Sequence, residues 1–176
     1  EIHTTVGDIF FRYITWGGDG ILIGIVCFVF LFVRLRYGIL LSLVSFISAF
    51  FVSLLKQFYD EPRPSRYFAG QDVNWVDGID LYANHSFPSG HAAAAFTMFL
   101  LMSFFFNNKS LTAVFFVLAL LVAISRVYLF QHFLIDVWVG SLCGVVFGTI
   151  LFHLIMITPL FKNKTCHNLS LLKSPK

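Results

Sequence analysis

The stretch Ser125-Arg-Val-Tyr-Leu-Phe-Gln-His-Phe-Leu-Ile-Asp136 joins two apolar segments, yet it contains an arginine, a histidine and an aspartate. Ionisable side chains at the edge of a membrane-spanning segment are costly to bury, and where they occur they usually have a function. Since His132 and Asp136 are four residues apart, we expect them to lie on one face of a helix. The stretch therefore predicts a polar site at one end of a set of membrane helices.

The composition of the chain is that of a membrane protein. Hydrophobic residues make up 58% of the 176 residues and charged residues only 12%. A water-soluble domain of this size could not bury so much apolar surface, and helices satisfy their own backbone hydrogen bonds inside a bilayer. We therefore expect an all-α, integral membrane helical bundle. The net charge of +3 includes no Arg/Lys-rich run of the kind that binds nucleic acid, and the three cysteines indicate no disulfide.

The apolar segments predict five spans and one helix at the membrane surface, all within a single domain of residues 1–176. The spans are expected at about residues 20–35, 37–55, 89–106, 111–126 and 132–160. Residues 4–16 have apolar side chains at helical spacing but also Asp8 and Arg12, which predicts an interfacial helix. Because the chain does not begin with Met and five spans leave Glu1 outside, we also expect a sixth span that precedes this chain.

Charged residues are distributed unevenly between the two ends of these spans. One end has basic residues and no acidic ones, namely Arg34, Arg36, Lys109, Lys162, Lys164, Lys173 and Lys176. Every Asp and Glu falls toward the other end, together with the polar stretch at residues 125–136. The positive-inside rule therefore predicts that the tail at residues 161–176 is cytoplasmic and that the polar site lies at the outer face.

A second polar segment, Lys56-Gln-Phe-Tyr-Asp-Glu-Pro-Arg-Pro64, follows the second predicted span. Arg63 lies between two prolines, which restrict the backbone to extended forms. A guanidinium fixed in this way beside the Lys56 ammonium suits the oxygens of a phosphate. The alternative is that Lys56 only extends from the membrane to water and that Arg63 pairs with a neighbouring acid.

A third polar segment, Phe87-Pro-Ser-Gly-His91, precedes four alanines that predict the start of a helix. Ser89 can cap this helix, and the free N–H groups of its first turn favour an anion. Gly90 lets an oxyanion approach the backbone closely, and His91 is placed to donate a proton. The alternative is an ordinary helix cap with a histidine that has no function.

The stretch at residues 125–136 supplies the candidate nucleophile. Neutral His132 can attack phosphorus through one ring nitrogen if Asp136 holds the proton on the other. Ser125 and Arg126 would lie across the turn and contact the phosphoryl oxygens. The alternative is a structural His–Asp pair at the start of a helix.

A metal site is the main competing interpretation of the same residues. Nitrogen and oxygen ligands for zinc are available from His85, His91, His132 and Asp136. Three basic side chains in the same segments would repel a divalent cation unless a phosphate lay between them. The sequence therefore favours an anion site with no metal and no cofactor.

In chain order the three segments contain Lys-x6-Arg-Pro, Pro-Ser-Gly-His and Ser-Arg-x5-His-x3-Asp. This pattern resembles the type 2 phosphatidic acid phosphatase superfamily of membrane lipid phosphatases. The resemblance implies a six-helix membrane bundle and a metal-independent phosphatase. It also implies that His132 forms a phosphohistidine, that Asp136 supports it and that His91 protonates the leaving oxygen. The phosphate-binding residues that it implies are Lys56, Arg63, Ser89, Gly90 and Arg126.

The expected substrate is a phosphorylated lipid that reaches the outer face by diffusing in the membrane. The small size and the absence of a soluble domain resemble bacterial members, so we expect a bacterial inner membrane protein. Undecaprenyl pyrophosphate is the first choice, followed by lipid A phosphate and phosphatidylglycerol phosphate. The alternative of another class is a non-catalytic protein that binds or carries phosphorylated lipids. The loop at residues 65–84 is expected either to gate the pocket or to anchor at the interface.

Overall fold

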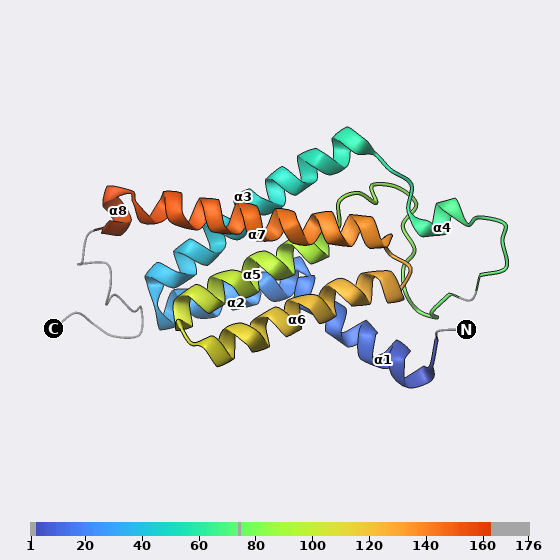
Figure 1. The fold of residues 1–176 in the computed structure, drawn as a ribbon, viewed down its shortest axis with the longest axis horizontal. Helices are drawn as coiled ribbons and strands as arrows, with labels where there is room; N and C mark the ends of the chain where they lie inside the picture. Colours follow the sequence, from blue (N-terminus) through green and yellow to red (C-terminus); the bar gives the residue numbers. More distant parts are fainter. Residues whose placement is uncertain (1–2, 74, 163–176) are drawn as a thin grey trace.

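The computed structural model describes residues 3–73 and 75–162, and this part of the chain is helical without any strand (Figure 1). The predicted all-α fold is therefore confirmed. The elements are α1 (Thr5–Ile14), the 3-10 turn η1 (Thr15–Gly18), α2 (Gly20–Val33), α3 (Leu35–Tyr59), α4 (Pro64–Tyr67), α5 (Gly90–Phe106), α6 (Lys109–Tyr128), α7 (Leu134–Met156) and α8 (Pro159–Lys162). Most of the predicted tail, including Lys164, Lys173 and Lys176, lies outside the described residues, as does any span before Glu1.

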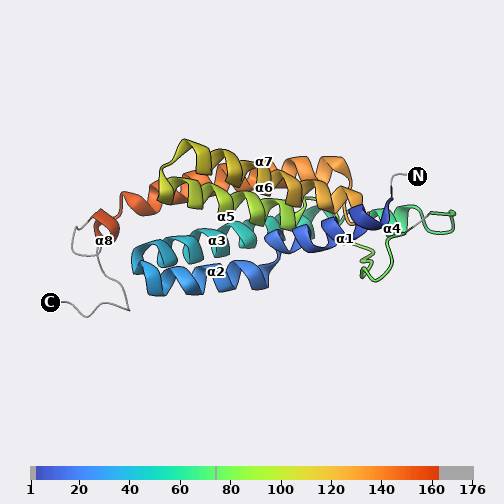
Figure 2. The ribbon, with the colours of Figure 1, turned by 90° about the horizontal axis from the view of Figure 1, so that it is seen from below.

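Polar side chains determine where several helices begin. Thr4, Asp19, Ser89 and Asn108 occupy N-cap positions, and each accepts a hydrogen bond from a backbone N–H two or three residues further on. These bonds satisfy donors that the first turn of a helix leaves free. Arg34 alone separates α2 from α3, so these two helices are antiparallel neighbours. Figure 2 shows them in one layer, with α5, α6 and α7 in the other.

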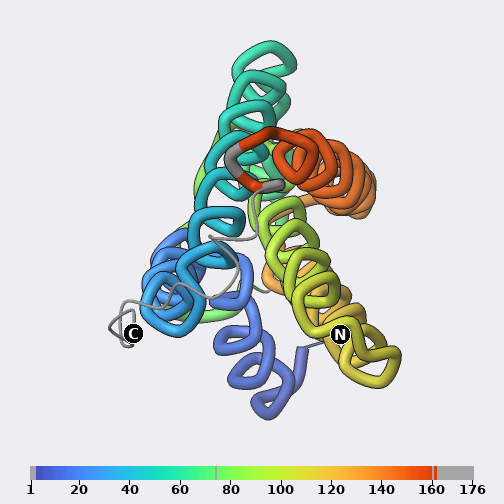
Figure 3. The backbone as a smooth tube through the Cα atoms, turned by 90° about the vertical axis from the view of Figure 1, so that its left-hand side faces the viewer, coloured from blue at the N-terminus to red at the C-terminus, as the bar shows by residue number. Residues whose placement is uncertain are grey.

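The central helix α5 packs against α3, α6 and α7, as the view along the bundle shows (Figure 3). Toward α5, α7 presents Gly140, Gly144 and Gly148. A Cβ at Gly140 would lie 2.4 Å from the carbonyl oxygen of Ser89, and one at Gly144 would lie 2.4 Å from that of Ala93. The two helices are therefore in backbone contact, which small residues permit in membranes. This contact places the first turn of α5 beside the first turn of α7.

The outside of the bundle is apolar, as expected of helices that face lipid. Large hydrophobic side chains are exposed on all the long helices, among them Phe28, Phe46, Phe116, Val117, Trp138, Val146 and Ile150. Three helical segments are long and apolar enough to cross a membrane, namely Leu35–Tyr67, Lys109–Tyr128 and Leu134–Met156. The apolar helix α5 is shorter, and α1–η1 with α2 passes the same test only as one span bent by 53°.

The helix of the last predicted span, α7, starts later than the sequence pattern predicts. The pattern predicts a helix from residue 132 to 160, with His132 and Asp136 on one face, whereas α7 begins at Leu134 and ends at Met156. The backbone N–H of His132 instead donates to the carbonyl oxygen of Arg126 at 3.2 Å, which closes the turn after α6. The prediction that the two residues share a helix face is therefore wrong. They still meet, because the carboxylate of Asp136 turns back toward the residues before α7.

Candidate active site

The three polar segments meet at one end of the bundle, where α3 ends and where α5 and α7 begin (Figure 1). Two backbone hydrogen bonds join them. The N–H of Ser86 donates to the carbonyl oxygen of Glu61 at 2.9 Å, and the N–H of Ser89 donates to that of Asp136 at 2.8 Å. Segments that are up to 80 residues apart in sequence, from Lys56 to Asp136, thus lie side by side.

A buried carboxylate lies beside the imidazole of His132. Oδ2 of Asp136 is 3.6 Å from Nδ1 of His132, and both residues are 3% exposed. The same oxygen accepts hydrogen bonds from the hydroxyl of Ser86 at 2.5 Å and from the backbone N–H of Phe133 at 2.9 Å. Asp136 therefore closes the first turn of α7 and reaches back to the residue before that turn. With Nδ1 facing the carboxylate, Nε2 is the ring nitrogen that can attack a substrate.

The pKa of His132 is lowered from 6.5 to about 4. Burial has the largest effect, because it disfavours the charged imidazolium. The hydrogen bond to Asp136 raises the pKa, and the positive charges of Arg63, Lys56 and Arg126 lower it. His132 is therefore neutral near pH 7, as a nitrogen nucleophile must be.

Gln131, which is buried, holds the two arginines of the site. Its side-chain oxygen accepts from Nη1 of Arg63 at 3.2 Å and lies 3.5 Å from Nη2 of Arg126. Arg63 also donates to the backbone oxygen of Asn84 at 3.0 Å, and Arg126 donates to the hydroxyl of Thr15 at 2.7 Å. Both guanidinium groups are thereby fixed in position, which suits the recognition of a phosphate.

One donor of this cluster has no hydrogen-bond partner. Nε of Arg126 is buried and unpaired among the residues that the structure describes. An unpaired buried donor is costly, and an anion beside it would satisfy it. The ammonium of Lys56 donates to the carbonyl oxygen of His85 at 2.8 Å and lies at the same end of the bundle.

The start of α5 completes the cluster. Ser89 is fully buried, and its hydroxyl accepts from the N–H of Ala92 at 3.4 Å. A Cβ at Gly90 would lie 3.4 Å from Cε of Lys56, so the first turn of α5 adjoins the lysine. Nε2 of His91 lies 4.0 Å from Oδ2 of Asp19. The N–H groups of a first helical turn favour an anion, and His91 lies in this first turn of α5.

Several residues around the site have no signal in the sequence pattern. Ser86, Gln131 and Thr15 bond to predicted site residues, and Asp19 lies beside His91. Gln131 precedes His132 directly, but its burial and its contacts with the arginines are visible only in the structure. Thr15 and Asp19 come from the N-terminal segment, and no spacing rule connects them with the site.

The possible metal ligands are not assembled in the described part of the chain. There, no three side chains of His, Cys, Asp or Glu form a group that could hold a metal ion. His85, one of the four ligands considered, has its Nδ1 3.0 Å from Oδ1 of Asp60.

Comparisons with known proteins identify relatives of the chain. The model of the PAP2 superfamily matches residues 36–158, a region that contains all eight predicted site residues. The crystal structure of Aquifex aeolicus LpxE has 30% sequence identity and a TM-score of 0.77, covering 86% of this chain and 88% of that chain. A transmembrane PAP2-type phosphatidylglycerolphosphate phosphatase from Bacillus subtilis has 25% identity and a TM-score of 0.73, covering 90% and 81%. A comparison with curated protein sequences found no match.

Proposed function

This chain belongs to the PAP2 superfamily and is an integral-membrane lipid phosphatase, and we propose that it acts through a phosphohistidine formed on His132. The resemblance predicted from the sequence is confirmed by the family match and by both structures. The observation that carries the mechanism is the buried imidazole of His132, which faces the carboxylate of Asp136. Burial and the charges of three nearby cations lower the pKa of this imidazole, which favours its neutral form.

In the first step Nε2 of His132 attacks phosphorus. The N–P bond forms while the bond between phosphorus and the oxygen on the lipid side breaks. The imidazolium form of His91, which the negative charge of the bound phosphate favours, gives its proton to that oxygen. The transferring group carries its charge on three equatorial oxygens, which fixed cations stabilise without rearrangement. The groups that bind these oxygens in this scheme are Lys56, Arg63, Arg126 and the first turn of α5 with Ser89 and Gly90.

In the second step water attacks the phosphohistidine. His91, now neutral, takes a proton from the water, and His132 leaves phosphorus as inorganic phosphate forms. Throughout the cycle Asp136 keeps the proton on Nδ1 and stabilises the positive charge that the imidazole acquires. No metal or cofactor takes part in either step.

The lipid that we propose first is undecaprenyl pyrophosphate, with lipid A phosphate and phosphatidylglycerol phosphate as alternatives. The similarity to two bacterial proteins, Aquifex aeolicus LpxE and the Bacillus subtilis phosphatase, supports a lipid of the bacterial envelope. The similarity to the Bacillus subtilis phosphatidylglycerolphosphate phosphatase supports the last of the three.

The charges at the two ends of the bundle support an orientation in the bacterial inner membrane. The basic residues Arg34, Arg36, Lys109 and Lys162 lie at helix ends opposite the candidate site (Figure 1). The site end contains the acidic side chains of the described chain, including Asp19, Asp60 and Asp136. By the positive-inside rule, the site faces the periplasm or exterior, and the C-terminus is cytoplasmic.

The test is phosphate release by the purified protein in detergent, with and without EDTA. The three lipids are compared side by side for wild type, His132→Ala and the control His153→Ala, whose histidine is exposed near the far end of α7. We expect release that EDTA leaves unchanged, that His153→Ala retains and that His132→Ala loses. Acid-labile ³²P on the protein after rapid quenching would identify the intermediate. Retained activity in His132→Ala excludes His132 as the nucleophile, and lipid binding without release by wild type favours a carrier.

A further inference from the structure

We propose that a groove between α2, α3 and α5 binds one hydrocarbon chain of the phosphorylated lipid, and that Gly24 determines how far a chain can enter. This inference rests on the proposed function, because it assumes that a lipid phosphate binds at the cluster of Lys56, Arg63 and Arg126. It concerns the part of the ligand that the catalytic residues do not touch.

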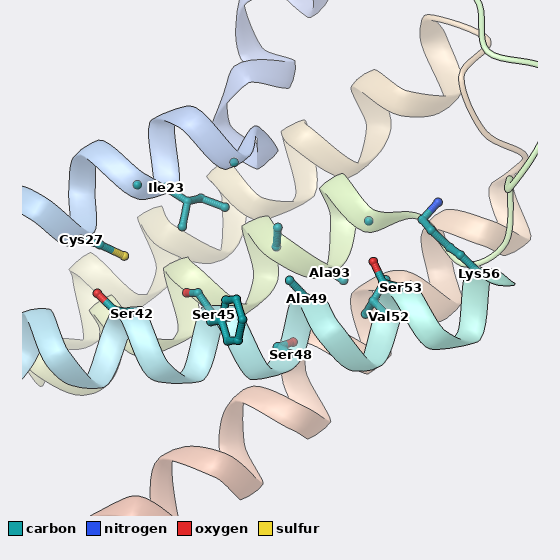
Figure 4. A pocket seen from close by; sticks show the side chains of 15 residues that line it. Ile23, Cys27, Ser42, Ser45, Ser48, Ala49, Val52, Ser53, Lys56 and Ala93 are labelled. Atoms are coloured by element: carbon teal, nitrogen blue, oxygen red, sulfur yellow. The ribbon is translucent and has the colours of Figure 1, made fainter.

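The groove has a volume of about 420 Å³ and mostly apolar walls (Figure 4). It exists because all three helices carry small side chains where they face one another. The small residues that line it are Gly20, Gly24, Ser42, Ser45, Ser48, Ala49, Ser53, Gly90, Ala93 and Ala94. In Figure 4, Ile23 and Cys27 of α2 face Ser42 and Ser45 of α3 across it. An apolar space of this size, open along one side, suits a single flexible hydrocarbon chain.

The groove is continuous with the candidate phosphate site. Lys56 and Gly90 line the end of the groove that is nearest the candidate site, and both are predicted phosphate-binding residues. A phosphate held by the Lys56 ammonium therefore has its substituent at the mouth of the groove. A charged head at the site and an apolar chain in the groove match the two parts of a lipid phosphate.

The direction of attack also favours this side of the site. In an in-line displacement the leaving oxygen lies opposite the attacking nitrogen, and the proposed acid for it is His91. His91 follows Gly90 and has its Nε2 4.0 Å from Asp19, the residue before Gly20; both glycines line the groove. The lipid attached to the leaving oxygen is therefore next to the groove.

A larger cavity of about 820 Å³ is less suited to the chain. It lies between residues 64–73 and the ends of α6 and α7. Of the eight predicted site residues only His132 lines it, so it adjoins the nucleophile. A chain placed there would extend from the attacking side of phosphorus.

The length of the groove and the open space at Gly24 are the basis for the proposed role of this residue. Lys56 and Ser42 are 14 residues apart on α3, which is about 21 Å at 1.5 Å per residue. The hydrocarbon of one leaflet is about 15 Å thick, so the groove suits a chain segment of about that length, which is an acyl chain or the first part of an undecaprenyl chain. A Cβ added at Gly24 meets no atom within 4 Å, so a larger side chain there would enter open space.

Two variants test the groove by filling it. Gly24→Leu improves helix propensity, and its Cβ would meet no described atom within 4 Å. Ser45→Leu acts from the opposite wall, and the Ser45 hydroxyl is buried with no hydrogen-bond partner in the described residues, so no such bond is lost. The control Ile25→Phe enlarges a side chain of α2 that is 54% exposed and does not line the groove.

The measurement is the dissociation constant of hexyl phosphate and of hexadecyl phosphate, by calorimetry at one detergent concentration. All variants carry His132→Ala, so that neither ligand is turned over in the proposed scheme. We expect the parent and Ile25→Phe to prefer the long chain. Each filled variant should lose at least about tenfold of that preference, the value of about two buried methylenes.

The possible results separate the groove from the proposed reaction. An unchanged preference in both folded variants, with circular dichroism melts like the parent's, overturns the groove even if wild type is an active phosphatase. A lost preference supports the groove. If wild type binds neither alkyl phosphate and releases no phosphate from the lipids, the proposed function fails, and the groove inference fails with it.

Discussion

The carboxylate of Asp136 lies 3.6 Å from Nδ1 of His132, although the two residues do not share a helix. The contact arises because the same carboxylate accepts the backbone N–H of Phe133 at the start of α7. One side chain thus fixes a helix terminus and orients an imidazole. This double role makes it possible to separate the chemical contribution of Asp136 from its structural one.

Asp136→Asn is expected to keep the fold and to lose most of the activity. The side-chain oxygen of asparagine can still accept the N–H of Phe133, the N-cap residue, so the start of α7 should persist. It would not hold the proton on Nδ1, and in a comparable triad such a change costs about 10⁴-fold in kcat. Steady-state kinetics and a melting curve measure the two effects. The control is Asp77→Asn, whose side chain is exposed and which should behave as wild type. Activity within threefold of wild type would remove Asp136 from the mechanism.

Ser86→Ala is expected to reduce stability. The Ser86 hydroxyl donates to a buried carboxylate, and loss of a hydrogen bond to a charged group costs about 1.5–3 kcal/mol. Denaturant unfolding in mixed micelles would measure the loss. The comparison variant is Ser103→Ala, because Ser103 donates to a backbone oxygen in a part-buried position. Equal losses of the free energy of unfolding in the two variants would mean that the bond to the charged Asp136 is no stronger than a bond to a backbone oxygen.

The lowered pKa of His132 predicts how the site responds to acid. Burial lowers the folded-state pKa to about 4, below the ordinary value of 6.5. As the pH falls, the unfolded state therefore takes up the proton first. The contribution of His132 to the free energy of unfolding is fully present above pH 6.5 and is lost as the pH falls toward 4. NMR of ¹³C-labelled histidine should show a resonance that titrates near pH 4 and is absent in His132→Gln. A His132 resonance that titrates near 6.5 would contradict the buried, neutral imidazole.

Gln131→Leu is expected to weaken the binding of phosphate more than it lowers kcat. The substitution removes the oxygen that faces Arg63 and Arg126, so both guanidinium groups lose a fixed position. Product inhibition by inorganic phosphate should become about tenfold weaker, which corresponds to the loss of one ordinary hydrogen bond. Gln57→Leu, at an exposed position of α3, is the matched control. Unchanged inhibition in Gln131→Leu would show that the arginines are held by other contacts.

The sequence predicted which residues meet at one end of the bundle better than it predicted the contacts between them. Ionisable side chains at the ends of apolar segments are rare, so Lys56, His91 and His132 stood out without a structure. The start of α7 was missed because it depends on a hydrogen bond between His132 and Arg126 that closes the preceding turn. Periodicity cannot detect such a bond, since it reports which side chains are apolar and not where the backbone turns.

The roles of Gln131 and Thr15 depend on tertiary contacts. Each bonds to Arg126, one from the next turn and one from the N-terminal segment. A threonine within the predicted interfacial helix, residues 4–16, has many possible partners. Only the packing of η1 against α6 determines that this partner is an arginine of the site.

Gly140→Ala tests whether close packing of α5 on α7 also determines the geometry of the site. The added Cβ would lie 2.4 Å from the Ser89 carbonyl oxygen, which is backbone and cannot rotate away. The helices must separate, at a cost of about 1–3 kcal/mol as for other overpacked contacts. Because the Ser89 N–H donates to the Asp136 carbonyl oxygen, separation would also move the first turn of α5 away from His132.

We therefore expect Gly140→Ala to lower both the melting temperature and kcat. For the melting temperature the matched control is Gly24→Ala, where the same methyl group meets nothing within 4 Å and helix propensity improves by about 0.5–1 kcal/mol. A loss of stability without a loss of kcat would mean that the start of α5 stays in place when the helices separate. In that case the bond between Ser89 and Asp136, and not the glycine contact, would hold the site together.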